Sequence, residues 1–205
     1  MLINKYSERR GISRYYFLDP FVGLVIDTYV WEISATGGGW VGMTQGLGGR
    51  AIIMAGVTVG DVAYIQQSTS KNFDISTGIN AGFKIRILDL TDCIIRFAFL
   101  QDSTNTIYIA LNTSIGSNWI SVCQDGSGST TVDSGITVNT NWHEVRLNCT
   151  AAQCNFLLDG ISIATITTHI PVGLFGPQMH AYRVTSGYDY RSCLIDWVEA
   201  SGGRA

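Results

Sequence analysis

The chain has 205 residues, a formal net charge of −3 and 14% charged residues, well below the roughly 25% of an average soluble protein. Its length suits one large β-sandwich, and its 23 glycines accompany many Ser, Thr and Asn residues, as in strands and turns. The acidic balance and the lack of Lys and Arg runs exclude a nucleic-acid partner, and no window approaches the roughly 18 apolar residues of a membrane span.

The N-terminal segment, residues 1–20, differs in composition from residues 21–205, which we predict to form a single domain. It contains a group of basic and aromatic residues: Arg9, Arg10, Arg14, Tyr15 and Tyr16. Two interpretations remain open, namely an arm that docks on an acidic or apolar partner, or a first segment that covers an edge of the sandwich. The segment lacks the apolar core of a secretion signal, so we expect a protein made in the cytosol and not exported by a cleaved signal.

Beyond this segment, apolar residues recur with a period of two, the spacing of a half-buried β-strand. Phe83, Ile85 and Ile87 alternate with Lys84 and Arg86, for example. Comparable runs occur along the rest of the chain, at residues 28–34, 51–55, 62–66, 95–99, 107–111, 119–123, 142–147, 155–158, 161–167, 179–184 and 193–198. Turn residues separate the runs at intervals of about ten, which predicts an all-β, two-sheet antiparallel sandwich.

The glycine-rich stretch Gly37–Gly49 resembles a phosphate-binding loop in composition alone. It lacks the Gly-Lys-Ser/Thr ending of such loops and precedes no helix. We therefore predict a flexible loop that carries Trp40 and Met43. The Trp40 ring either lies exposed as a platform for a ligand or folds back over the core.

Two hairpins are readable in the second half of the chain. Asp159-Gly160 predicts a type I′ turn, because that turn needs positive φ at both central residues. The loop Thr150–Gln153 joins the strand that ends at Cys149 to the strand that begins at Cys154. Because side chains alternate between the two faces of a strand, Cys149 and Cys154 lie on the same face and can meet across this hairpin. We treat a disulfide between these cysteines and a pair of reduced thiols as equally open.

Five cysteines leave at least one thiol free or paired between chains. We expect Cys93, Cys123 and Cys193 to be small buried apolar residues.

No chemical site emerges from the motifs. The histidines lie far apart without a second ligand at metal spacing, so neither a metal nor another cofactor is expected. The Glu-x-Asp-x-Glu run of glycosidases on related sandwiches is absent, and so is the Gly-x-Ser-x-Gly motif of esterases. We therefore predict no catalytic residue and no enzymatic activity.

A succession of motifs in the second half resembles the concanavalin A-like (laminin G-like) jelly roll. The motifs are Asp133-Ser134-Gly135, Trp142-His143-Glu144-Val145-Arg146-Leu147, Phe156-Leu157-Leu158-Asp159-Gly160, His169-Ile170-Pro171 and Ile195-Asp196-Trp197-Val198. They are similar in particular to versions found in structural proteins of tailed bacteriophages, such as capsid decoration, head-fibre and tail-fibre modules. The resemblance implies two curved antiparallel sheets, with the strand around Ile195 and Trp197 closing beside an early strand.

The resemblance implies a non-enzymatic virion structural protein, a capsid decoration or fibre protein of a bacteriophage. Such a protein would be made in the host cytoplasm, reside in the virion as a homo-oligomer, and contact other virion proteins such as the major capsid or tail protein. The alternative is a carbohydrate-binding, lectin-like module, in which Trp40, Trp119 and Tyr188 stack on sugar rings. The two roles are compatible, since a virion protein can also adhere to glycans.

Overall fold

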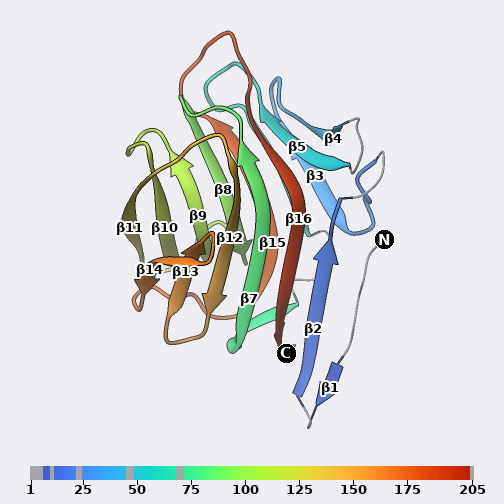
Figure 1. Cartoon of the computed structure of the whole chain (residues 1–205), viewed down its shortest axis with the longest axis vertical. Helices are drawn as coiled ribbons and strands as arrows, with labels where there is room; N and C mark the ends of the chain where they lie inside the picture. The colour runs from blue at the N-terminus through green and yellow to red at the C-terminus, as the bar shows by residue number, and fades with distance from the viewer. Residues whose placement is uncertain (1–6, 10–11, 22–24, 45–48, 68–71, 204–205) are drawn as a thin grey trace.

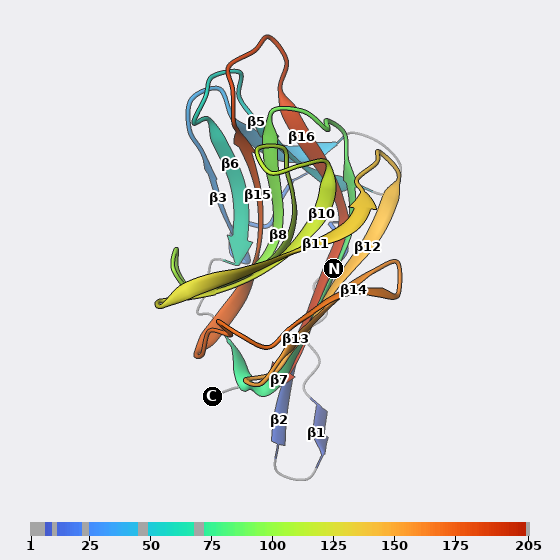
Figure 2. The ribbon, with the colours of Figure 1, turned by 90° about the vertical axis from the view of Figure 1, so that its left-hand side faces the viewer.

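The computed structural model describes residues 7–9, 12–21, 25–44, 49–67 and 72–203, with side chains from Leu18 onward. Its strands form two antiparallel layers, sheet A and sheet B, which Figures 1 and 2 show from two sides. This confirms the two-sheet antiparallel sandwich that the alternating sequence pattern predicts and the jelly roll that the family resemblance implies. The described residues include no helix with the length and apolar character needed to cross a membrane.

Sheet A is ordered β1-β2-β16-β7-β12-β13-β14, and β5 and β4 extend it beside the first half of β16. The strand bounds are β1 (Ser7–Arg9), β2 (Ile12–Asp19), β4 (Trp40–Thr44), β5 (Arg50–Ala55), β7 (Phe73–Ile87), β12 (Trp142–Cys149), β13 (Cys154–Leu158), β14 (Ile161–Ile166) and β16 (Arg191–Gly203).

Sheet B is ordered β3-β6-β15-β8-β9-β10-β11. The strand bounds are β3 (Trp31–Ala35), β6 (Val62–Gln67), β8 (Cys93–Leu100), β9 (Thr106–Asn112), β10 (Asn118–Asp125), β11 (Gly128–Thr137) and β15 (Leu174–Arg183). The two sheets meet at the start of β15, where Leu174 and Phe175 pair with β7 before the strand continues beside β8.

The core lies between the sheets and follows from the period-two pattern. In β7, Phe83 and Ile85 are fully buried, and in β8 Ile95 and Phe97 are fully buried as well. The rings of Phe83 and Phe97 lie 6.1 Å apart between their centroids, so the two layers contact each other directly. The same alternation turns Arg96 to the outer face of sheet B, where the candidate site lies.

The prediction of a flexible glycine-rich loop is wrong for its central part, because residues 40–44 form strand β4 against β5. Val41 and Met43 pack on the core from alternate positions, which makes the segment a strand. Trp40 is 46% exposed and paired with Met54 on the outer face of sheet A. Its ring covers Gly42, where an added Cβ would lie 2.2 Å from Cζ2 of the tryptophan.

The N-terminal segment contributes the two outermost strands of sheet A. Tyr15 and Tyr16 of β2 pair with Gly202 and Ser201 of β16, and Arg14 pairs with Gly203. Arg9 lies in β1, whereas Arg10 falls outside the described residues. Residues 7–9 and 12–19 thus form strands at one edge of sheet A, and the docking of this segment on a partner stays a prediction.

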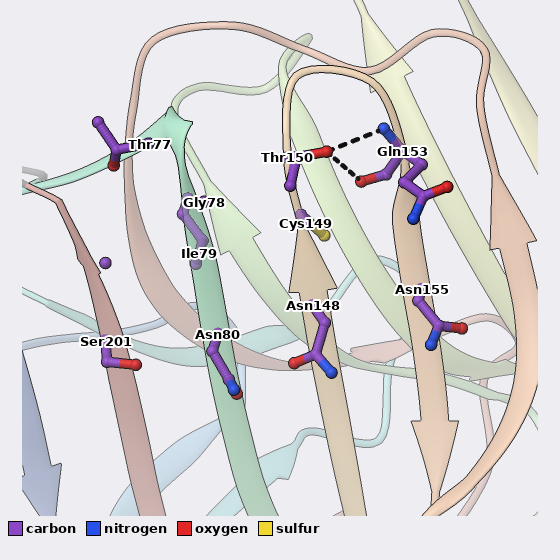
Figure 3. Close-up of a pocket in the computed structure, with 11 residues that line it drawn as sticks. Thr77, Gly78, Ile79, Asn80, Asn148, Cys149, Thr150, Gln153, Asn155 and Ser201 are labelled. Carbon is purple, nitrogen blue, oxygen red and sulfur yellow. Dashed lines mark hydrogen bonds between the residues drawn. The ribbon is translucent and has the colours of Figure 1, made fainter.

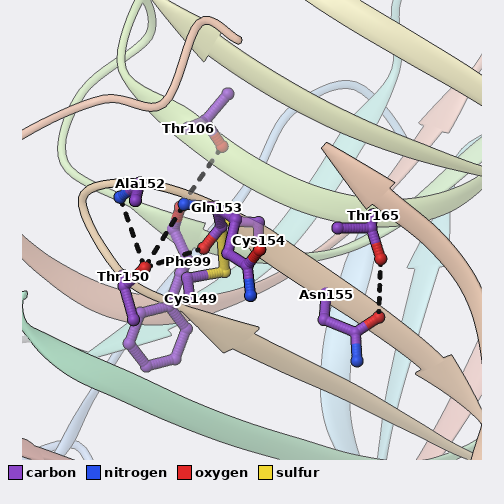
Figure 4. The surroundings of a disulfide bond; sticks show 9 residues. All are labelled: Phe99, Thr106, Cys149, Thr150, Ala152, Gln153, Cys154, Asn155 and Thr165. Carbon is purple, nitrogen blue, oxygen red and sulfur yellow. Dashed lines mark hydrogen bonds between the residues drawn. A yellow bond between two sulfur atoms is a disulfide. The ribbon is translucent and has the colours of Figure 1, made fainter. Parts of the chain in front are cut away.

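The two hairpins of the second half have the expected register. Asp159 and Gly160 have φ values of 51° and 81°, as a type I′ turn requires. Cys149 and Cys154 occupy directly opposed positions in β12 and β13, with 4.1 Å between their Cα atoms, and form a disulfide (Figure 4). Thr150 closes the loop by accepting hydrogen bonds from the amides of Ala152 and Gln153.

The remaining cysteines, Cys93, Cys123 and Cys193, are buried free thiols. Burial raises the pKa of Cys93 and of Cys123 to about 12, so these thiols are protonated and unreactive at neutral pH.

Candidate functional site

The candidate site is a depression of about 310 Å³ on the outer face of sheet B. Figure 2 shows that this sheet curves, and the strand order places β3 and β6 toward one edge and β10 and β11 at the other. We call this outer surface the concave face. Side chains of five strands or their connections line the depression: Val62, Tyr64, Arg96, Ala98, Leu100, Ser103, Thr106, Gln124, Gln178 and His180.

The middle of the concave face carries a row of polar side chains on neighbouring strands. Tyr64 of β6 pairs with His180 of β15, and His180 pairs in turn with Arg96 of β8. Paired residues of antiparallel strands point to the same face, so these side chains lie side by side. None of them forms a hydrogen bond or ion pair with another described residue. We call Tyr64, His180 and Arg96 the polar row.

A second row runs beside it and is internally hydrogen-bonded. Gln178 of β15 donates to Oε1 of Gln66 at 3.0 Å, and Gln66 donates to Oε2 of Glu32 at 2.7 Å. Glu32 lies on β3, the edge strand of the sheet. The chain of contacts holds both glutamines in fixed orientations and occupies one carboxylate oxygen of Glu32.

The other half of the concave face is apolar. Ala110, Ile120 and Val122 of β9 and β10 form a small cluster of buried residues, and Tyr108 packs against it. The Arg96 guanidinium lies over the Tyr108 ring at 4.9 Å from its centroid, a cation–π contact that joins the polar and apolar halves.

The electrostatics of the polar row keep its histidine uncharged. Burial, and secondly the nearby positive charge of Arg96, lower the pKa of His180 from 6.5 to about 4. At neutral pH the imidazole therefore has one N–H donor and one nitrogen acceptor, both available to a ligand. Burial also raises the pKa of Tyr108, although the charge of Arg96 opposes this effect.

Carboxylates on the concave face are confined to its rims. Among the described strand residues, Glu32 on β3 and Asp133 on β11 are the acids that the register places there. Six strand spacings separate β3 from β11, roughly 29 Å along the sheet. Glycoside hydrolysis by two carboxylates needs them about 5 to 10 Å apart, so this pair cannot act together.

A second depression, of about 390 Å³, lies on sheet A beside the disulfide hairpin. Figure 3 shows Ser201, Asn80, Asn148 and Asn155 in a row across neighbouring strands, and the register confirms that they are paired residues. The Oδ1 atom of Asn148 is buried without a hydrogen-bond partner. Because the described residues that line this depression include neither an aromatic nor a charged side chain, it offers less for recognition than the concave face.

The residues predicted to contact glycans do not line either depression. Trp119 was predicted as an exposed platform, and this is wrong: its side chain is fully buried in the core, edge-on to His143. Trp40 lies on the outer face of sheet A, and Tyr188 is fully exposed in the loop between β15 and β16. The structure does not bring these three residues together.

Sequence reasoning missed the side chains that do line the concave face. The local signal is present, because Tyr64, Arg96 and His180 each lie between apolar neighbours in their strands. Their proximity depends on β15 pairing with β6 and β8, and no local pattern specifies that pairing. The described residues also contain no group of three or more His, Cys, Asp or Glu side chains that could hold a metal ion.

Comparisons with known proteins supply the fold family. No protein-family model matches the sequence, and no curated protein matches it either. Among solved structures, a β-1,3-glucanase from Mycobacterium marinum has a TM-score of 0.68 at 16% identity, covering 90% of this chain and 97% of its own. A family 16 endo-glucanase from Bacteroides ovatus scores 0.67 at 13% identity, covering 89% and 98%. A glycosyl hydrolase family protein from Mycobacterium fortuitum scores 0.68 at 16% identity, covering 90% and 98%.

These similarities correct the functional expectations from the sequence. The predictions of a bacteriophage virion structural protein and of a non-enzymatic role are contradicted, because the matched structures are glucanases and other glycoside hydrolases. The resemblance to phage decoration and fibre modules is likewise unsupported beyond the fold itself. At these identities the similarity establishes the architecture: the chain has the concanavalin A-like jelly-roll fold of family 16 glycoside hydrolases.

Proposed function

We propose that this protein is carbohydrate-active and that the concave face of sheet B binds an oligosaccharide. The observation that carries the proposal is the polar row, in which Tyr64, His180 and Arg96 line a depression and form no side-chain hydrogen bond with another residue of the described part of the chain. Buried or half-buried polar groups without partners cost free energy, which a bound ligand can recover.

The composition of the concave face suits a sugar ring. A sugar offers hydroxyl groups around its edge and apolar C–H groups on its faces. The polar row and Gln178 supply hydrogen-bond donors and acceptors for the hydroxyl groups. Beside them lies an apolar surface formed by Tyr108, Ile120 and Val122. The hydrogen bonds that already fix Gln178 orient its amide before binding, which reduces the entropy lost when a ligand binds.

Binding measurements on matched variants test this location. A screen of neutral and acidic oligosaccharides identifies a ligand, and titration calorimetry then compares Tyr64→Phe and His180→Gln with the wild type. Loss of one neutral hydrogen bond should weaken binding by roughly 2- to 10-fold for each variant. Tyr188→Phe is the control, since this exposed tyrosine lies outside the depression.

The alternative location has its own variant. Asn80→Ala alters the second depression on sheet A without touching sheet B. If Asn80→Ala or Tyr188→Phe weakens binding while Tyr64→Phe and His180→Gln do not, the concave face is not the binding site.

Hydrolysis of the bound glycan is a second candidate, favoured by the glycoside hydrolases that share the fold. Glu32 is the carboxylate nearest the polar row by register, and its distance from Asp133 rules out a joint two-carboxylate mechanism. Chromatography of products from wild type and Glu32→Gln tests this candidate. Turnover that Glu32→Gln leaves unchanged would place any hydrolytic chemistry elsewhere.

A further inference from the structure

We propose that the glycan bound by the concave face is anionic, and that Arg96 binds its carboxylate or sulfate group. This inference rests on the proposed glycan-binding function and names the class of glycan. It is carried by the position of Arg96 in the depression, the lack of an acceptor for it among the described residues, and the distribution of charge around it.

Arg96 differs from the other arginines whose side chains the structure describes. Each of the others contacts a protein oxygen: Arg50 pairs with Asp196, Arg86 donates to Thr140, Arg146 pairs with Glu199, Arg183 donates to Asp189 and Arg191 lies near Asp89. Arg96 has no such acceptor among the described residues, and its Nε atom is buried without a hydrogen-bond partner.

The charge around Arg96 favours an anion. The acids on this face, Glu32 and Asp133, lie at opposite rims and already accept hydrogen bonds from Gln66 and Asn118. His180 is uncharged at neutral pH because burial and Arg96 lower its pKa to about 4. Among the described residues, the centre of the concave face therefore carries one positive charge with no nearby counter-charge.

The surroundings of the Arg96 guanidinium leave space for an acidic group of a glycan. Two of the residues next to Arg96 on the same face are small, Ala110 at the paired position of β9 and Ala98 two residues along β8, whereas the neutral His180 lies at the paired position of β15. The Tyr108 ring lies against the guanidinium, with 4.9 Å between the ring centroid and Cζ of Arg96. A planar guanidinium binds carboxylate and sulfate oxygens through charge-assisted hydrogen bonds, which are stronger than those between neutral groups.

The test uses three forms of one gluco-oligosaccharide with the full-length protein: the neutral oligosaccharide, its derivative oxidised to uronate at C6, and its O-sulfated derivative. We expect at least one acidic derivative to bind about tenfold or more tightly than the neutral form, as measured by titration calorimetry. The preference should shrink as salt is raised from 50 to 500 mM, because salt screens the charge. Comparison of the uronate and the sulfated derivative shows which acidic group Arg96 binds.

Arg96→Gln should abolish the preference for the acidic form and change binding of the neutral form by no more than a few-fold. Arg96→Lys keeps the charge and should retain part of the preference, provided thermal unfolding shows that both variants are folded. Arg50→Gln is the matched control, since it removes the same charge from sheet A.

Three outcomes decide between the two proposals. Equal affinity of the wild type for all three forms would overturn the anionic inference and leave glycan binding intact. A preference for acidic forms that persists in Arg96→Gln would also overturn it. If the wild type binds none of the three forms and no other oligosaccharide of the screen, the proposed function itself fails.

Discussion

Replacement of Arg96 by glutamine should raise the pKa of His180. In the wild type, burial and the charge of Arg96 together lower this pKa from 6.5 to about 4, and burial is the larger of the two causes. Arg96 thus accounts for less than half of the difference of about 2.5 between these values. The pKa of His180 in Arg96→Gln is therefore expected to rise but to remain below 6.5, because burial still disfavours the charged imidazole.

The lowered pKa of His180 also makes folding stability depend on pH. The unfolded chain takes up this proton near pH 6.5, whereas the folded protein resists it until about pH 4. Stability therefore falls as pH drops through this window, by about 3 kcal/mol at pH 4 for this histidine. The variant His180→Gln should lack that part of the pH dependence.

Nuclear magnetic resonance titration of the histidine ring protons measures the His180 pKa directly. His143 and His169 serve as internal references, because they contact Asp159 and Thr130 away from the concave face. A His180 pKa near 6.5 in the wild type, or one that is unchanged by Arg96→Gln, would refute the arrangement of the polar row.

Stability measurements offer further tests. Asp159→Asn should lower the free energy of unfolding by about 1 kcal/mol at pH 7, because it removes the carboxylate that lies 2.7 Å from His143. Burial opposes ionisation of Asp159, but hydrogen bonds from a backbone amide and His143 outweigh it and lower the pKa of Asp159. The loss of stability in Asp159→Asn should therefore fade as pH falls below 4. Urea titrations that give equal losses at pH 7 and pH 2.5 would contradict this. Reduction of the Cys149–Cys154 disulfide should cost about 2 kcal/mol, and a double serine variant should show no response to reductant. Trp119→Ala should cost about 3 to 5 kcal/mol, since the ring is fully buried, and a loss below 1 kcal/mol would contradict its place in the core.

Local sequence patterns predict much of the fold. The alternation of Phe83, Ile85 and Ile87 with charged residues assigns a strand and its two faces, because side-chain direction repeats every two residues. The Asp159-Gly160 turn is equally local, since its positive φ values depend on those two residues alone. Such features need no knowledge of which strands pair.

The candidate site could not be predicted in the same way. Residues 119–123 are apolar on both faces, so the pattern cannot say whether the Trp119 side chain faces the core or the surface. The polar row is assembled from residues 64, 96 and 180, and their adjacency arises only when β15 inserts between β6 and β8. The sequence therefore contains the alternation that turns each side chain outward, but not the pairing that gathers them.

The functional prediction failed for a related reason. The absence of a Glu-x-Asp-x-Glu run predicts a non-enzymatic protein, whereas the solved structures that share the fold are glycoside hydrolases. A motif of one strand says little about a face built from seven strands, whose other polar groups remain available to a ligand.

The most direct test of glycan binding on the concave face is an amide chemical-shift map of the protein with and without a bound oligosaccharide. The perturbed amides are expected to cluster on β6, β15, β8 and β9 around Tyr64, His180 and Arg96. Perturbations confined to sheet A, around Asn80 and Asn148, would show instead that the ligand occupies the opposite face and that the account of the concave face is wrong.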